Sequence, residues 1–155
     1  MANNPQKGQG LRFALALLAG TVAGSALLGA CGDDDSGPGI DAIEFTVVTT
    51  DQLRYEPSEL RVHAGQPVIV HVDNQDGSST HDLSIETIKV GNVDVDEPKE
   101  VPGHMHMDHL DLHVMLGAAQ QASITFTPTK PGTYEFFCTT TGHREAGMTG
   151  VLIVE

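Results

Sequence analysis

The stretch of sequence that decides the fold is GTYEFFCTTTGHREAGMTGVLIV, which covers residues 132–154. Its two ends, 132–137 and 150–154, are rich in aromatic and β-branched residues and are bounded by Gly, a pattern typical of strands. The loop between them carries side chains that bind soft metals: the thiol, imidazole and thioether of Cys138, His143 and Met148. We therefore predict two strands whose connection presents three metal ligands.

Five more alternating segments precede this pair, and turn residues separate them. They span residues 43–48, 60–63, 68–72, 83–88 and 122–127. The sequence has no convincing helical period, and its 17 Gly and 8 Pro divide it into short apolar runs. This organisation favours an all-β domain, and we predict a Greek-key β-sandwich of about seven to eight strands formed by residues 42–155.

The first thirty residues have the order of an export signal. Lys7 and Arg12 precede an apolar run, and the run ends at Leu28-Gly29-Ala30-Cys31. Charged, apolar and small-residue regions in this order are typical of a signal peptide, and the last four residues resemble a bacterial lipobox. We predict a lipoprotein signal at 1–30, lipidation of Cys31 and a flexible tether at 31–41. A transmembrane anchor and a plain secretory signal remain alternatives.

The charge balance limits the classes of partner. The formal net charge is −13, and all 21 acidic residues follow the apolar leader, whereas two of the eight basic residues precede it. Such an acidic domain argues against nucleic acid, since a phosphate backbone needs a basic surface. The acidity is compatible with a basic redox partner or with solubility alone.

The cysteine count supports a metal site. The chain has two cysteines, and the lipobox would consume Cys31. Cys138 is then the lone thiol of an exported domain, where an unoccupied thiol is exposed to oxidation. A bound metal would explain its presence.

The ligand chemistry suggests copper. Thiolate, imidazole and thioether form a soft set that suits this metal, with the thioether as a weak axial ligand. We expect the second imidazole from His81, which closes a Gly- and Ser-rich loop at the start of a strand. His63 and His71 fit the solvent face of alternating strands instead. Zinc accepts the same Cys and His ligands, although Met148 makes it the weaker choice.

Residues 89–117 are polar and irregular in pattern, and they are too long for an ordinary connection between strands. We predict that they form a His- and Met-rich insertion. Its imidazoles make a candidate second, weaker metal site at His104, His106, His109 and His113. The interleaved thioethers suit Cu(I). A solvated flap over the sandwich remains the alternative.

Three motifs together resemble the cupredoxin family, particularly its auracyanin, rusticyanin and sulfocyanin-like members. They are Tyr55-Glu56-Pro57 with Val62 and Gly65, the segment from Pro131 to Cys138, and the segment from Gly142 to Met148, with four residues in each ligand gap. Two positions depart from the family pattern. Thr141 stands where many relatives have Pro, and Asp82 stands where many have Asn or Ser.

The resemblance implies one type 1 copper ion held by His81, Cys138 and His143, with Met148 axial. It implies a one-electron carrier outside the cytoplasm rather than an enzyme, with redox partners such as a cytochrome or respiratory complex. The ring edge of His143 would be the port for electrons. The His- and Met-rich insertion keeps a copper-trafficking role open as the alternative.

Overall fold

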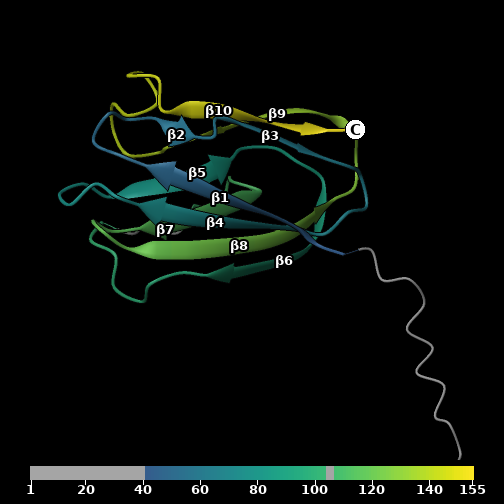
Figure 1. Cartoon of the computed structure of the whole chain (residues 1–155), viewed down its shortest axis with the longest axis horizontal. Helices are drawn as coiled ribbons and strands as arrows, with labels where there is room; N and C mark the ends of the chain where they lie inside the picture. The colour runs from purple at the N-terminus through teal and green to yellow at the C-terminus, as the bar shows by residue number, and fades with distance from the viewer. Residues whose placement is uncertain (1–40, 104–106) are drawn as a thin grey trace, which may run out of the picture. The chain divides into compact units, whose positions relative to one another are not determined.

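The computed structural model describes residues 41–103 and 107–155, and these form a β-sandwich of two five-stranded sheets (Figure 1). The predicted signal peptide, Cys31 and all of the tether before residue 41 lie outside the described residues. The same holds for His104 and His106. No helix among the described residues is long and apolar enough to cross a membrane.

The first sheet has, in spatial order, β2 (Tyr55–Glu56), β1 (Ile43–Thr49), β4 (Val68–Asn74), β8 (Gln121–Pro128) and β6 (Val90–Asp96). The second has β3 (Glu59–Val62), β10 (Thr149–Val154), β9 (Gly132–Phe137), β5 (His81–Ile85) and β7 (Leu112–Leu116). Two pairings, β1 with β4 and β3 with β10, are parallel, and the others are antiparallel.

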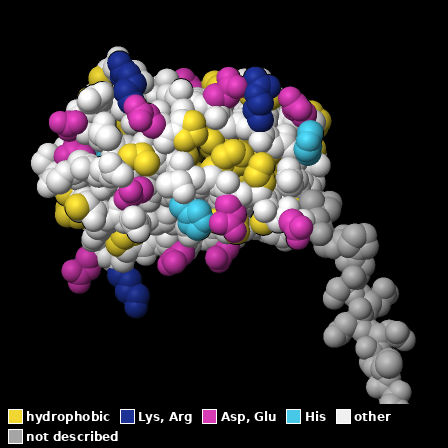
Figure 2. Space-filling view, viewed as in Figure 1, with side chains coloured by type: hydrophobic (Ala, Val, Ile, Leu, Met, Phe, Trp, Pro, Cys, Tyr) yellow, Lys and Arg dark blue, Asp and Glu magenta, His cyan; other side chains and the backbone are white. Residues whose placement is uncertain are grey.

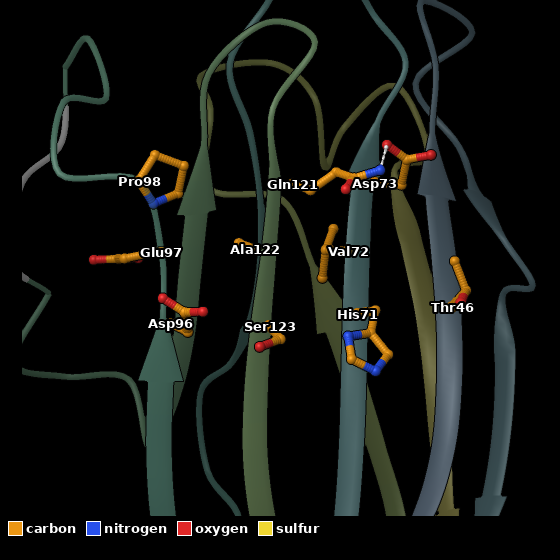
Figure 3. Close-up of a pocket in the computed structure, with 10 residues that line it drawn as sticks. All are labelled: Thr46, His71, Val72, Asp73, Asp96, Glu97, Pro98, Gln121, Ala122 and Ser123. Carbon is orange, nitrogen blue, oxygen red and sulfur yellow. Dashed lines mark hydrogen bonds between the residues drawn. The ribbon is translucent and has the colours of Figure 1, made fainter. Parts of the chain in front are cut away.

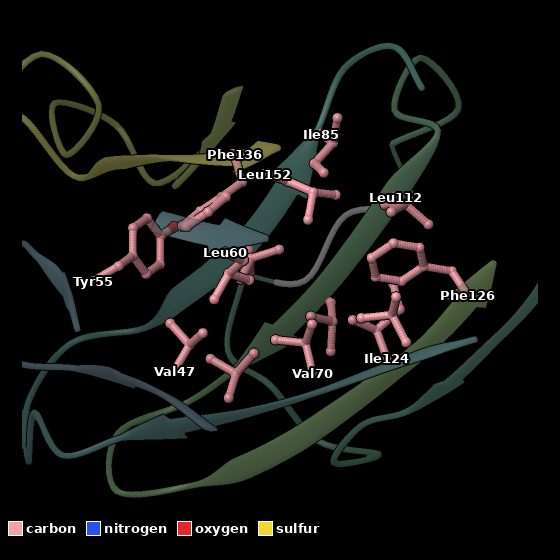
Figure 4. Close-up of a cluster of buried hydrophobic side chains, with 14 of the residues drawn as sticks. Val47, Tyr55, Leu60, Val70, Ile85, Leu112, Ile124, Phe126, Phe136 and Leu152 are labelled. Carbon is pink, nitrogen blue, oxygen red and sulfur yellow. The ribbon is translucent and has the colours of Figure 1, made fainter. Parts of the chain in front are cut away.

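The core lies between the two sheets and follows from the alternation of side chains along each strand. In β4, Val68, Val70 and Val72 are buried, and His71 between them is exposed. Phe126 of β8 and Leu152 of β10 belong to the same apolar cluster, which draws on both sheets (Figure 4). Strands β4, β8 and β10 therefore each turn one face to the interior and the other outward.

The seven predicted strands are confirmed with small shifts in their ends, but the prediction of an irregular 89–117 is wrong in part. This region contains β6 and β7, and the irregular part is the segment between them. β6 has mostly exposed side chains, and a register shift between Gly91 and Asp94 interrupts its alternation. β7 is almost continuously buried, which hides its period of two. The short β2 was also missed.

The two histidines assigned to the solvent face are exposed as predicted. His71 lies on β4, and His63 directly follows β3. His71 Nε2 lies 3.4 Å from Glu44 Oε2, a pair at the surface. Asp and Glu side chains are spread over the face shown in Figure 2, with few Lys and Arg among them.

The core packing makes a prediction for stability. Phe126 is 2% exposed, and Phe126→Ala should lower the free energy of unfolding by about 3–5 kcal/mol through lost burial and a cavity. Val93→Ala on β6, where the side chain is 47% exposed, is the control and should change it by less than about 0.5 kcal/mol. Guanidinium denaturation of the copper-free protein measures both. Equal losses would contradict this assignment of the core.

Candidate metal centre

Three of the four predicted ligands lie in line with the side chains that face the interior on their strands. His81 shares its face with Leu83 and Ile85 on β5, because side chains two apart point the same way. By the same rule Cys138 follows the buried Phe136, and Met148 precedes Gly150 and the buried Leu152. The ligands therefore emerge from the core side of the sandwich. All three of these ligand side chains are buried.

Backbone hydrogen bonds shape the loop that carries the other ligand. The Cys138 N–H donates to the Met148 carbonyl (3.2 Å), and the Met148 N–H donates to the His143 carbonyl (2.9 Å). The His143 N–H in turn donates to the carbonyl of Thr140 at 2.9 Å. Gly142, just before the histidine, has a φ of 84°, a left-handed conformation that favours Gly. The loop lies at the left-hand end of the sandwich in Figure 1.

The structure brings three of the predicted ligands together. One ligand atom from each of His81, Cys138 and His143 lies within 4.8 Å of the others. Cys138 Sγ is 3.6 Å from His143 Nδ1, and the two imidazole rings have centroids 5.0 Å apart. Among the described residues, this is the only group of three or more His, Cys, Asp or Glu side chains close enough to share an ion. Met148 adds its buried thioether from the end of the same loop.

The orientation of His81 leaves one ring nitrogen available to a metal ion. Its Nε2 lies 3.3 Å from Asp76 Oδ2, and since an ionised carboxylate only accepts, this nitrogen carries the proton. Nδ1 keeps its lone pair, and this buried atom has no hydrogen-bond partner. An unsatisfied buried acceptor is costly unless something else occupies it. Burial lowers the pKa of His81 despite the carboxylate, which favours the neutral form that binds metals.

Asp76 is held in place by the turn before β5. The hydroxyl and N–H of Ser78 donate to its Oδ1 at 2.7 and 2.8 Å, and the Ser79 N–H donates at 3.2 Å. These bonds, those of Ser78 foremost, hold the pKa of Asp76 well below its ordinary value. The sequence analysis missed this residue. Its signal was the sequence Asp76-Gly77-Ser78-Ser79 shortly before His81, which is typical of a turn in which a carboxylate bonds nearby N–H groups.

A second carboxylate joins the strand of His81 to the loop of Cys138. Asp82 is fully buried and accepts hydrogen bonds from the Thr139 N–H (2.9 Å) and hydroxyl (2.8 Å) and from the Ser84 hydroxyl (2.7 Å). Its Oδ2 lies 3.6 Å from Cys138 Sγ. Asp82 is one of the two departures from the family pattern noted in the sequence, and the structure places its carboxylate beside the thiol of Cys138.

The surface beside His143 is open. His143 is half-buried, and its loop neighbours Gly142, Ala146 and Gly147 are exposed. Arg144 stacks 3.7 Å from the ring centroid of Phe137 and pairs with Glu135. These two contacts fix the position of its guanidinium group.

The described members of the second predicted site, His109 and His113, are not part of the three-ligand group. His109 is exposed in a turn and lines a cavity of about 400 Å³ with Met107 and the loop of Cys138. His113 is half-buried on β7, where its Nδ1 lies 2.8 Å from the Ser84 hydroxyl. A separate groove of about 550 Å³ lies on the outer face of the first sheet, beside His71 and Asp96 (Figure 3), and neither His109 nor His113 lines it.

Comparison with known proteins finds relatives of this domain. The family described as a cupredoxin-like domain matches residues 23–154. The chain is 32% identical over 108 residues to the copper-resistant cuproprotein CopI of Rubrivivax gelatinosus, covering 70% of this chain and 64% of CopI. It is 50% identical over 40 residues to auracyanin-B of Chloroflexus aurantiacus, covering 26% of this chain and 17% of that protein. The chain thus matches less than two thirds of the length of either relative.

Solved structures share the fold. Dithionite-reduced auracyanin from Roseiflexus castenholzii superposes with a TM-score of 0.54 and 25% identity, covering 74% of this chain and 96% of that one. Auracyanin A, a "blue" copper protein of Chloroflexus aurantiacus, superposes with a TM-score of 0.56 and 19% identity, covering 74% and 100%. The second match supports the fold alone. Together they confirm the predicted all-β sandwich.

The buried thiol makes a prediction for pH dependence. Burial, followed by the charge of Asp82, raises the pKa of Cys138 to about 11 in the metal-free protein. The unfolded chain therefore releases the thiol proton first, and the fold should lose stability between about pH 9 and pH 11. The free energy of unfolding, measured by denaturation across this pH range, should fall in Cys31→Ser and stay flatter in Cys31→Ser/Cys138→Ser. The difference between the two variants isolates the contribution of the Cys138 thiol. Parallel curves for the two variants would contradict the raised pKa.

Proposed function

Because the chain belongs to the cupredoxin-like domain family, we propose that it is a one-electron carrier built on a single type 1 copper ion. His81, Cys138 and His143 would hold the ion, with Met148 as the axial ligand. The observation that carries the proposal is that the buried Nδ1 of His81 has no hydrogen-bond partner. The same imidazole lies close to the thiol of Cys138 and the imidazole of His143. Copper, when bound, supplies a reversible one-electron change between Cu(I) and Cu(II).

The protein itself keeps the ligands in fixed positions and shields His81, Cys138 and Met148 from water. Three of the proposed ligands lie in line with the inward-facing side chains of their strands, and Asp76 and Asp82 fix the side chain of His81 and the loop of Cys138 by hydrogen bonds. Preset ligands reorganise little between oxidation states, which favours electron transfer. The half-buried His143, flanked by exposed small residues, is the point at which a redox protein could approach. We propose electron carriage rather than catalysis for this site.

The carboxylate of Asp82 should also influence the reduction potential. A negative charge 3.6 Å from the copper-binding sulfur favours the more positive Cu(II) state. We therefore propose a lower potential than that of relatives with an amide or hydroxyl at this position.

Copper handling is the second candidate function. It is supported by the similarity to a protein named for copper resistance and by Met107 and His109, which line a cavity against the ligand loop. In this role the protein would pass copper to an acceptor. Imidazoles at His104, His106, His109 and His113 remain proposed ligands of a second, weaker site.

Copper loading tests the proposed centre. The oxidised protein should bind one copper in the sandwich and absorb visible light intensely through a thiolate-to-copper transition. Cys138→Ser should abolish this band because no other thiolate lies in the site, and His81→Ala should weaken or shift it. Electron exchange with a reduced cytochrome, compared with copper transfer to a copper-free acceptor, separates the two functions. An unchanged band in Cys138→Ser would refute the centre.

We further propose that the protein acts outside the cytoplasm, anchored to a membrane by lipid on Cys31. Stable anchoring takes more than one acyl chain, which a bacterial lipoprotein would carry. Cys31→Ser should move the protein from the membrane fraction to the soluble fraction or leave it unprocessed. Mass spectrometry that finds a mature N-terminus beyond Cys31 would contradict the anchor.

A further inference from the structure

Two thioethers line a cavity beside the candidate copper centre. The cavity, of about 430 Å³, lies between Pro102-Gly103 and the loop that carries His143. Met107 and Met115 contribute to its wall, together with His143 itself. Neither thioether belongs to the ligand set of the proposed type 1 site.

Met115 is in an unusual place for a residue that only fills the core. It is 5% exposed, yet it lies outside the main apolar cluster of the described residues, which includes its neighbours Val114 and Leu116. It stands opposite Asp82 in the β5–β7 register, and cross-strand partners share a face. Its backbone N–H donates to Glu97 Oε2 at 3.0 Å. The side chain therefore faces a cavity whose other walls are mainly Ser, Thr, Pro and Gly.

Met107 borders a second cavity as well. It lines the neighbouring cavity of about 400 Å³, whose wall includes Cys138 and the exposed His109. The segment Thr139–Thr141 borders both cavities. One flexible thioether therefore borders both the space beside His143 and the space beside Cys138.

We propose that Met107 and Met115 form a labile capture site for Cu(I), which loads the copper centre by way of His143. Thioethers are soft ligands that prefer Cu(I). They carry no charge and take up no proton, so they can hold the ion weakly at neutral pH and release it to stronger ligands. This inference rests on the proposed copper centre, because that centre is the destination of the ion.

The transfer is a ligand exchange without a redox step. Cu(I) leaves the sulfur atoms of Met107 and Met115 and binds the sulfur of Cys138 and the imidazoles. The thiol proton of Cys138 passes to solvent. The ion stays in the +1 state, so no oxidant is needed.

Silver(I) is the probe, since it binds thioethers as Cu(I) does and does not change oxidation state under these conditions. The full chain with Cys31→Ser and Cys138→Ser removes both competing thiolates. Methionine labelled with ¹³C at the methyl group should show the Met107 and Met115 signals shifting together during titration, assigned by single Met→Leu variants. Adding Met107→Leu/Met115→Leu, which conserves volume, should weaken binding by at least about tenfold, or about 1.4 kcal/mol.

Loading kinetics give the second readout. Metal-free protein with Cys138 intact, supplied with Cu(I) from a weak chelator, should load more slowly in Met107→Leu/Met115→Leu, while the final visible band after oxidation stays the same. The matched control for the Ag(I) titration is Met148→Leu. It removes a thioether from the proposed centre and should leave the Ag(I)-induced shifts of the Met107 and Met115 signals unchanged.

The outcomes separate this proposal from the proposed function. If the wild type shows no thiolate-to-copper band but Ag(I) still shifts the Met107 and Met115 signals, the centre fails and the capture site stands. If the band is normal but Ag(I) shifts the Met148 signal alone, or binds the double Leu variant as tightly as its parent, the two thioethers are packing residues and this proposal is overturned.

Discussion

The geometry of the candidate centre depends on one constraint, the alternation of side chains along a strand. Because residues two apart share a face, the rows that fill the core with Leu83 and Phe136 also deliver His81 and Cys138 to the same interior. A shift of one residue in β5 or β9 would turn a ligand out of the site. The core and the candidate metal site therefore depend on the same strand registers, and the packing of the sandwich also aligns the candidate ligands.

This coupling explains how much could be predicted from the sequence. The seven alternating segments and the spacing from Cys138 to Met148 are local patterns, and the structure places His81, Cys138 and His143 together as expected. β7 could not be found in the same way, because a strand buried on both faces has no alternation to detect. The role of Asp76 also required the fold, since its contact with His81 depends on how one turn closes.

The segment between β6 and β7 shows a different limit. Its composition suggested metal binding, but composition does not say which side chains meet. Met115, which the sequence offered only as part of a His- and Met-rich tract, faces a cavity beside His143 because β7 pairs with β5. His113, two residues earlier on the same face, is directed instead to the Ser84 hydroxyl. The surroundings of each side chain are therefore set by its cross-strand partner, which is Ser84 for His113 and Asp82 for Met115.

Asp82 links the two demands that a redox centre places on its protein. As a structural group it is well satisfied, because three donors from Thr139 and Ser84 replace the water lost on burial. An amide at this position could accept hydrogen bonds as well, but it would bring no net charge to within 3.6 Å of the sulfur of Cys138. The carboxylate therefore fixes the loop much as a neutral group could, and in the proposed copper centre it would in addition favour the more positive Cu(II) state. One side chain would then set both loop geometry and redox preference, and a neutral acceptor at residue 82 could preserve the first while changing the second.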